Sequence, residues 1–392
     1  MKKNDKTDEF ISKYCCGCGF CSNYIDGAYD AQGFYRPNSV LIKEKFDVDL
    51  CYCNSFKDTV SDKLWGDFEN LYYSYSTDNF VRKKASSGGT LTEVASYLLE
   101  RGIVDYIIQI DSSDESKIKT QISISHTREE VINKSGSRYA ASAVLKDIFK
   151  LIDKSNKYAI IGKPCDITVL RTFMNKNPEW NLSILYLLTF FCGGTPSYQA
   201  NIELLKKMNL QEDQLSDFTY RGNGWPGKTT GLTKDGKVGT IDYEESWGKT
   251  LGRDLQNICR FCWDGVGSAA DISCGDGWYI ENGKPIFAER DGRNITFART
   301  KKGDTLLNEM FRANKINLEV EKDIGILEQM QPGQYMRKVA MFSRISAMRL
   351  MGKSVPKYNM RQLYRYAKKI SIMENLRMFY GTIKRIWRKK IK

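Results

Sequence analysis

The stretch from Asn257 to Trp278 reads NICRFCWDGVGSAADISCGDGW. It contains Cys259 and Cys262 as a Cys-x-x-Cys turn, which directs two thiolates toward one point. A pair of this kind suits zinc or an iron–sulfur cluster, and both need further ligands. The two missing thiolates must therefore come from elsewhere in the chain.

Two short buried strands are predicted upstream of this stretch, at 158–161 and 182–191. Each strand runs into a loop that carries one cysteine, Cys165 or Cys192, and a helix follows each loop. Strand–loop–helix units predict a parallel sheet, and ligands collect at the carboxyl ends of its strands. We therefore predict an α/β fold with mixed elements, in which these two cysteines join the Cys-x-x-Cys pair. The alternative is that both are structural, because cysteine is among the most buried residue types.

The composition bounds the class of protein. The chain has 392 residues, 41% of them apolar, which is enough for two or three domains with their own cores. MKKNDKTDEF at the N-terminus is not a signal peptide, and the most apolar run, Ile184–Cys192, is far shorter than the roughly 20 residues that span a bilayer. We expect a cytoplasmic protein whose eleven cysteines serve metal or redox chemistry. Its single histidine, His126, nearly excludes histidine-based catalysis.

The net charge of +13 is concentrated at the C-terminus. Residues 341–392 hold 15 Lys and Arg and one acid, so the remaining chain is close to neutral. From about residue 343 the pattern predicts a basic helical tail with an apolar stripe of Leu363, Tyr366, Ile370, Met373, Tyr380, Ile383 and Trp387. This tail could contact a membrane surface, dock an acidic redox partner, or pack on the body with a solvated face. Nucleic-acid binding is not expected, because the body has no basic groove or recognition motif.

A second cysteine-rich segment lies near the N-terminus. It contains Cys15, Cys18 and Cys21 at the C-x2-C-x2-C spacing of bacterial ferredoxins. The expected fourth ligand would fall at Ile25, and only Cys51 and Cys53 follow. The segment is therefore either the site of a cluster completed by Cys51 or Cys53, or a degenerate ferredoxin segment with zinc or no metal.

A small-residue turn precedes the first long predicted helix. Ser86-Ser87-Gly88-Gly89 leads into a helix that begins at Thr90, which forms a capping-box pair with Glu93. A glycine turn before a helix N-terminus suits an anion such as phosphate, although an ordinary capped helix explains the same residues.

Further elements follow from local patterns. We predict a helix over 141–153 after the turn SGSRY, a hairpin of 284–290 with 294–300, and a helix over 301–314. Cys274 is expected in the core as part of the strand ISC.

Taken in order, these motifs resemble the beta-subunit family of coenzyme F420 hydrogenase/dehydrogenase. The resemblance covers residues 13–305 and is carried by the N-terminal cysteines, SSGGTLTEVASYLLERGIVDYII, SGSRYAAS, IGKPCDITVLR, FFCGGTPS, the Cys-x-x-Cys pair, ADISCGDGW and ITFARTKKG.

The resemblance implies an iron–sulfur flavoprotein with a parallel-strand core that binds FAD and a 4Fe–4S cluster. The implied cluster ligands are Cys165, Cys192, Cys259 and Cys262, and a second cluster would take Cys15, Cys18, Cys21 and Cys51. The implied flavin contacts are Ser86, Ser87, Gly88, Gly89, Thr90, Lys163, Pro164 and Asp276. Lys163, together with Arg171, would also stabilise a reduced flavin or an anionic cofactor.

The expected function is an oxidoreductase that passes electrons between a two-electron carrier, of deazaflavin or NAD(P)H type, and a protein or small-molecule acceptor. Bacterial relatives suggest a link to surface polysaccharides. The alternative is a non-enzymatic, zinc-stabilised adaptor that docks a membrane or a partner through its basic tail.

Four segments are expected along the chain. They are a degenerate ferredoxin-like segment at 1–75, the first part of the flavin-binding core at 76–157, the second part with the four cysteines at 158–335, and the basic helical tail at 336–392.

Overall fold

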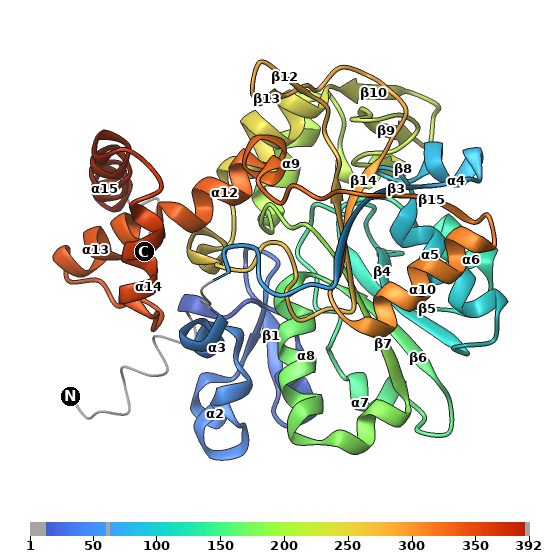
Figure 1. Cartoon of the computed structure of the whole chain (residues 1–392), viewed down its shortest axis with the longest axis horizontal. Helices are drawn as coiled ribbons and strands as arrows, with labels where there is room; N and C mark the ends of the chain where they lie inside the picture. Colours follow the sequence, from blue (N-terminus) through green and yellow to red (C-terminus); the bar gives the residue numbers. More distant parts are fainter. Residues whose placement is uncertain (1–12, 60–62, 389–392) are drawn as a thin grey trace.

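The computed structural model describes residues 13–59 and 63–388, and an eight-stranded mixed sheet forms its centre (Figure 1). The strand order is β15-β3-β14-β11-β7-β6-β4-β5. In chain order the strands are β3 (Asn70–Ser76), β4 (Tyr106–Ser112), β5 (Thr120–Ser125), β6 (Tyr158–Gly162), β7 (Ile184–Phe190), β11 (Ile272–Asp276), β14 (Asn294–Ala298) and β15 (Ile316–Val320).

The middle of this sheet is parallel. Strands β11, β7, β6 and β4 run in the same direction, whereas β14, β3, β15 and β5 are antiparallel to their neighbours. Successive side chains enter two separate cores, as Ala159 and Ile160 of β6 illustrate, because a strand alternates its side chains between faces. The predicted α/β fold with a parallel-strand core is confirmed.

Helices cover both faces of the sheet. Helices α5 (Thr90–Glu100) and α10 (Lys301–Arg312) pack on one face. Helix α8 (Pro164–Lys176) packs on the other, and the N-terminal cysteine segment lies against α8, where Phe20 and Phe173 meet with ring centroids 5.0 Å apart. The cysteine segment is therefore part of the main core.

Shorter elements complete the body. They are β1 (Gly27–Tyr29), β2 (Tyr35–Pro37), α2 (Ser39–Lys45), α3 (Tyr52–Thr59), α4 (Asn79–Lys84), α6 (Arg128–Asn133), α9 (Tyr198–Lys207), β8 (Leu215–Thr219), β9 (Thr229–Thr233), β10 (Val238–Ile241) and α11 (Ile326–Met330). Strands β10, β9 and β8 form a separate antiparallel sheet.

The start of α5 differs from the prediction, although the helix itself is confirmed. Gly89 is the N-cap, with φ +76°, and no capping box forms. The Thr90 hydroxyl instead bonds Ser74 at 2.9 Å, and the buried Glu93 carboxylate accepts two hydrogen bonds from Arg128 at 2.7 and 3.0 Å. Hydrogen bonds with residues distant in the sequence have thus replaced the predicted capping bonds between Thr90 and Glu93.

The predicted helix over 141–153 is wrong. Only α7 (Ile148–Leu151) is helical, and the preceding residues are irregular. The backbone N–H of Leu145 donates to the carbonyl of Cys18 at 3.0 Å, and a Cβ on Gly19 would lie 2.8 Å from Lys146. Contacts with the N-terminal cysteine loop hold this segment in an irregular conformation in place of the predicted helix.

The predicted hairpin between 284–290 and 294–300 is also wrong. Strand β13 (Lys284–Pro285) pairs with β12 (Ile280–Glu281), whereas β14 lies between β11 and β3 of the main sheet. The alternating pattern of residues 294–298 marked a strand, but its partners are far away in the sequence.

The C-terminal tail is helical, as predicted. It consists of α12 (Pro332–Val339), α13 (Met341–Leu350), α14 (Met360–Ala367) and α15 (Ile372–Trp387), and it protrudes from one side of the body (Figure 1). In the part of the chain that the structure describes, no helix is long and apolar enough to cross a bilayer.

Candidate cofactor cavity and cysteine sites

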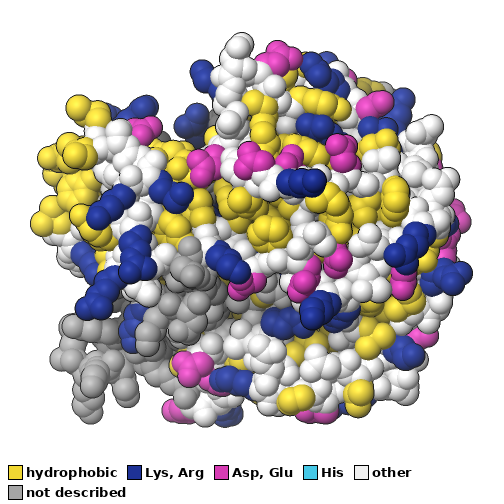
Figure 2. All heavy atoms as spheres, in the orientation of Figure 1, with side chains coloured by type: hydrophobic (Ala, Val, Ile, Leu, Met, Phe, Trp, Pro, Cys, Tyr) yellow, Lys and Arg dark blue, Asp and Glu magenta, His cyan; other side chains and the backbone are white. Residues whose placement is uncertain are grey.

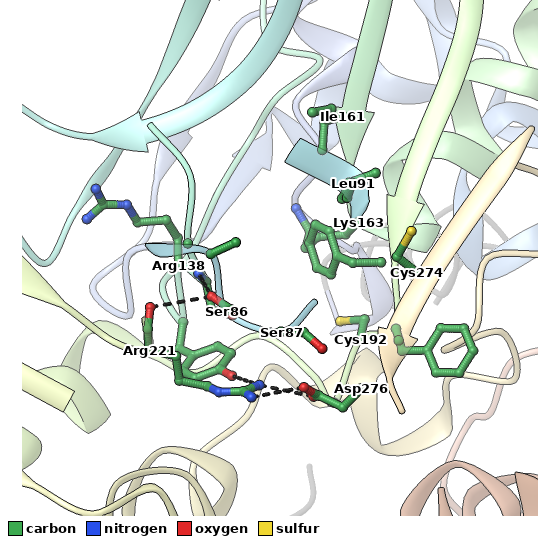
Figure 3. A pocket seen from close by; sticks show the side chains of 18 of the residues that line it. Ser86, Ser87, Leu91, Arg138, Ile161, Lys163, Cys192, Arg221, Cys274 and Asp276 are labelled. Atoms are coloured by element: carbon green, nitrogen blue, oxygen red, sulfur yellow. Dashed lines mark hydrogen bonds and ion pairs between the residues drawn. The ribbon is translucent and has the colours of Figure 1, made fainter. Parts of the chain in front are cut away.

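A cavity of about 410 Å³ opens at the carboxyl ends of three parallel strands (Figure 3). Its wall includes Ile161 at the end of β6, Phe190 at the end of β7 and Cys274 in β11. Apolar side chains such as Leu91, together with the Trp247 ring, complete this wall. The volume lies in the range of small-molecule and cofactor sites, and the position is where α/β folds bind ligands.

Two small-residue turns meet at one end of the cavity. The Ser86 hydroxyl accepts a hydrogen bond from the backbone N–H of Ser137, and Ser86 and Ser87 both line the cavity. Arg138 lies beside them, with its guanidinium 3.2 Å from Asp111. Serine hydroxyls and a guanidinium at one place suit a phosphate-bearing ligand.

The predicted flavin contacts divide into two groups. Those that line the cavity are Ser86, Ser87, Gly89, Lys163 and Asp276. Gly88, Thr90 and Pro164 are not part of the lining: Gly88 packs against β14, Thr90 bonds Ser74, and Pro164 begins α8.

Arg171 was predicted to act on a cofactor, and the structure contradicts this. Its guanidinium pairs with the buried carboxylate of Asp271 at 3.0 Å and donates to the carbonyl of Ala269 at 3.0 Å. It ties α8 to the segment before β11 and does not line the cavity.

Lys163 is a buried cation in the cavity wall. Its ammonium lies 2.9 Å from the Asp166 carboxylate and donates to the hydroxyl and carbonyl of Ser142 at 2.8 and 2.9 Å. Burial lowers the pKa of Lys163, but the Asp166 carboxylate and the Cys165 thiol outweigh burial and raise that pKa above its usual value. Lys163 therefore carries its charge beside the first cysteine of the four-cysteine group.

Arg221 and Asp276 form an ion pair at the opposite side. Both terminal guanidinium nitrogens of Arg221 reach the Asp276 carboxylate, at 2.9 and 3.0 Å (Figure 3). The indole N–H of Trp225 donates to the same carboxylate at 2.8 Å. Burial lowers the pKa of Arg221, but Asp276 raises it well above its usual value. Arg221 was not among the predicted site residues. The available signal was an arginine and a tryptophan inside the glycine-rich loop RGNGWPG.

The structure brings Cys165, Cys192, Cys259 and Cys262 together. Burial raises the pKa of Cys192, and the thiols of Cys259, Cys165 and Cys262 add to this increase. Burial likewise raises the pKa of Cys262 to about 12. We refer to these four residues as the four-cysteine group. Cys192 also lines the cavity, so the group and the cavity share a wall.

Hydrogen bonds support two sulfurs of this group. The backbone N–H of Thr195 donates to the Cys259 sulfur at 3.4 Å, and the Tyr52 hydroxyl lies 3.1 Å from the Cys262 sulfur. Outer partners of this kind orient metal ligands and tune a bound cluster.

The donor set bears on the kind of metal that the four-cysteine group suits. Within residues 13–59 and 63–388, no three His, Cys, Asp or Glu side chains form a site for a single metal ion. Four thiolates are the ligand set of a 4Fe–4S cluster and of a structural zinc site. The residue types of the four-cysteine group therefore fit an iron–sulfur cluster.

The N-terminal cysteines surround a separate, small cavity. Its wall includes six cysteines: Cys15, Cys16, Cys18, Cys21, Cys51 and Cys53. We refer to these as the N-terminal group. Burial and the thiols of Cys53, Cys15 and Cys21 raise the pKa of Cys51, so these four lie close together. The four cysteines predicted for a second cluster all line this cavity, and Cys53 joins them.

The two cysteine groups are neighbours. The Cys16 thiol lies beside the thiols of Cys165 and Cys18. Tyr52, between Cys51 and Cys53 in the chain, reaches the Cys262 sulfur. The two groups thus meet directly at Cys16 and Cys165, and Tyr52 of α3 adds a second contact.

Comparison with known families agrees with this architecture. The model for the N-terminal part of the coenzyme F420 hydrogenase/dehydrogenase beta subunit matches residues 71–148, and the model for its C-terminal part matches residues 155–323. The chain belongs to the coenzyme F420 hydrogenase/dehydrogenase beta-subunit family. The predicted family is confirmed, and residues 324–392 lie beyond the matched region.

Several curated relatives are similar over much of the chain. The coenzyme F420 hydrogenase subunit beta of Methanococcus voltae is 24% identical over 66% of this chain and 87% of the relative. The protein of the same name from Methanosarcina barkeri is 26% identical over 69% of this chain and 90% of the relative. For the F420-dependent formate dehydrogenase 1 subunit beta of Methanococcus maripaludis, identity is 26% and coverage is 59% of this chain and 62% of the relative.

The fold also matches a solved structure. A chain of the F420-reducing nickel–iron hydrogenase complex from Methanosarcina barkeri superposes with a TM-score of 0.56 at 20% identity, covering 76% of this chain and 98% of that chain. At this identity the likeness concerns the fold alone.

Proposed function

We propose that the protein is an iron–sulfur flavoprotein oxidoreductase, with FAD in the 410 Å³ cavity and a 4Fe–4S cluster on the four-cysteine group. The observation that carries this proposal is Cys192, which belongs to the four-cysteine group and lines the cavity. A cofactor in the cavity is thereby in contact with a cluster ligand.

The residues of the cavity fit a flavin nucleotide. Ser86, Ser87 and Arg138 would hold its phosphates, and the apolar wall that includes Leu91 and Trp247 would cover its ring. Bound flavin supplies an exchange between two-electron and one-electron chemistry, and the cluster supplies one-electron transfer. Lys163 holds a positive charge close to where negative charge accumulates on reduction.

The residues around the sulfurs would set the properties of the cluster. The Thr195 N–H and the Tyr52 hydroxyl stabilise negative charge on the sulfurs of Cys259 and Cys262. Gln334 and Arg337 of α12 donate to the carbonyl of Cys192 at 2.9 and 3.1 Å, which fixes the loop between cavity and cluster.

We further propose a second cluster on the N-terminal group, with Cys15, Cys21, Cys51 and Cys53 as ligands. Burial and the neighbouring Cys15 raise the pKa values of Cys21, Cys51 and Cys53, whereas the Cys18 thiol bonds that of Cys16, which lies beside Cys165. The two-electron carrier is a deazaflavin such as coenzyme F420, because the names of the M. voltae and M. barkeri relatives specify this carrier. NAD(P)H is the alternative two-electron carrier.

The test is an absorption spectrum with iron, zinc and flavin quantified on protein purified without oxygen. We expect flavin bands with a broad iron–sulfur shoulder that dithionite bleaches, and about eight irons and one FAD per chain. About four irons would remove the second cluster from the proposal. A colourless protein with about one zinc per chain would overturn it in favour of the adaptor.

The carrier is tested by anaerobic titration with reduced coenzyme F420 and, separately, with NADH or NADPH. Bleaching of the flavin by reduced F420 supports the assignment. Bleaching by NADH or NADPH alone would replace the deazaflavin with a nicotinamide carrier.

A further inference from the structure

Helix α15 packs on the tail through one face and exposes a second apolar face. Thr382 and Ile386 are buried, and Asn375 accepts a hydrogen bond from the Ser343 hydroxyl of α13 at 2.7 Å. On the opposite side Met373 is 74% exposed and Trp387 is 73% exposed. A surface helix of a soluble protein normally presents polar residues there.

Most of the exposed apolar residues of α15 form one stripe. Four of the five exposed large apolar residues of α15, Met373, Leu376, Tyr380 and Trp387, lie in this stripe, which we call the α15 stripe; the fifth, Ile372, is the first residue of the helix and lies outside it. Their spacing of three, four and seven residues places them within an arc of roughly 60° on a helix with 3.6 residues per turn. The stripe runs the length of the helix, on the order of 24 Å.

Cations flank one edge of the stripe. The spacing places Arg377, Lys384 and Arg388 immediately beside it, and all three are exposed. Among the described residues, none of these three cations forms an ion pair with an acidic side chain. The acid of α15, Glu374, caps the helix with Ser371.

This cation-rich tail has little internal compensation, because Glu374 is the single acid against 15 Lys and Arg in residues 341–392. The buried Arg344 of α13 illustrates this, because burial and the charges of Arg337 and Arg385 lower its pKa to about 10. An anionic surface outside the protein would relieve this repulsion. Figure 2 shows hydrophobic side chains over α15 with Lys and Arg beside them.

We propose that α15 docks the protein onto an anionic lipid bilayer, with the α15 stripe among the headgroups and Arg377, Lys384 and Arg388 at the lipid phosphates. An apolar stripe edged by Lys and Arg is the pattern of an interfacial helix, whose long cations extend toward the headgroups. Tyr380 and Trp387 are the residue types that favour the membrane interface. An acidic protein surface is a poorer partner for α15 than a bilayer. A charged protein face would leave four large apolar side chains without an apolar environment, whereas the headgroup layer of a bilayer buries them.

Docking would hold the four-cysteine group near the membrane. The tail contacts the Cys-x-x-Cys segment directly: Tyr358 of the tail donates to the carbonyl of Phe261, and the rings of Trp263 and Tyr366 lie 5.3 Å apart. The inference concerns binding alone and does not depend on the proposed redox function.

The test is flotation of the purified full-length protein with lipid vesicles. We expect binding to vesicles with about 30% phosphatidylserine, weak binding to pure phosphatidylcholine vesicles, and partial release as salt rises from about 0.1 to 1 M.

Two sets of substitutions assign binding to α15. Tyr380→Gln with Trp387→Gln should lower the partition coefficient about tenfold or more, and Arg377→Gln with Lys384→Gln should remove the preference for anionic vesicles. Matched controls change exposed residues elsewhere: Leu182→Gln with Phe311→Gln, and Lys301→Gln with Arg312→Gln. Thermal unfolding checks that each variant is folded.

Three results would overturn the proposal. They are equal binding to neutral and anionic vesicles, equal losses in the α15 variants and their controls, or no vesicle binding by the folded wild-type protein. In the last case, a defined acidic partner protein that binds through the same residues would replace the bilayer as the occupant.

Discussion

The two cysteine groups invite comparison because they are built from the same chemistry and lie side by side. The four-cysteine group stands at the carboxyl ends of parallel strands, and Cys192 forms part of the 410 Å³ cavity. The N-terminal group surrounds a small cavity of its own, whose other lining residues are largely apolar, such as Phe20 and Ile42. Position relative to the large cavity, not cysteine content, distinguishes them.

Under the proposed function, this difference implies a division of labour between two metal centres. A metal centre that shares a wall with a cofactor cavity exchanges electrons with that cofactor directly. The N-terminal group contacts the four-cysteine group through Tyr52 and Cys16. A centre there would extend the path of the electrons away from the cavity. Four substitutions test whether the two groups are separate centres with these two roles.

The largest effect is expected from Cys259→Ser. This change removes a proposed ligand of the four-cysteine group, so iron should fall by about four per chain and flavin should no longer reduce the remaining iron. Iron analysis and electron paramagnetic resonance check this. Cys274→Ser is the matched control, since Cys274 is a buried strand residue that also lines the large cavity. Unchanged iron in Cys259→Ser would defeat the ligand assignment.

The next effect concerns the N-terminal group alone. Cys53→Ser should lower iron from about eight to about four per chain and leave bleaching of the first cluster by reduced flavin intact. Cys16→Ser serves as its control, because Cys16 lies beside Cys165 and not in the proposed ligand set. Equal iron loss in both variants would show that the second ligand set is wrong.

A smaller effect is expected in the cavity. Asp276→Asn removes the partner of the buried Arg221 guanidinium, so FAD affinity should fall about tenfold while iron stays constant. Fluorescence titration of the flavin-free protein with FAD measures it. Asp304→Asn is the control: this carboxylate accepts from Tyr72 at 2.7 Å outside the cavity. A parallel loss of iron would mean that the change disturbs the fold.

The smallest effect is expected at the contact between the groups. Tyr52→Phe removes a hydrogen bond to the Cys262 sulfur, which stabilises the reduced cluster, so the potential of the first cluster should fall by roughly 40 mV. A redox titration followed spectroscopically measures the shift. Tyr358→Phe is the control, because that hydroxyl donates to the backbone of Phe261. An equal shift in both variants would assign the effect to packing.

Much of the fold follows from local patterns in the sequence. The buried runs at β6 and β7, each followed by a cysteine loop and a helix, were sufficient to predict the parallel core and the meeting of Cys165 with Cys192. Parallel strands place their carboxyl ends at one edge of the sheet, so spacing in the sequence translates into position in space.

The errors share one physical cause. The capping box at Thr90, the helix over 141–153 and the hairpin at 284–300 were all local predictions that distant partners overrode. Ser74 replaced the cap, Cys18 held the segment after Ala141, and β3 took the place of the expected hairpin partner. Arg221 was missed because its function arises from Asp276, 55 residues further along the chain.

The position of β3 has a consequence for how the protein is made. Residues 70–76 pair with β14 on one side and β15 on the other, both near residue 300. At a ribosomal rate of 5–20 residues per second, β3 therefore waits roughly 10–45 s for its partners. Throughout that interval the tyrosine-rich segment NLYYSYS has two unpaired edges, which other nascent chains could pair with. Expression at low temperature with a chaperone that shields exposed strands should thus raise the yield of soluble protein more than any change near the cysteines.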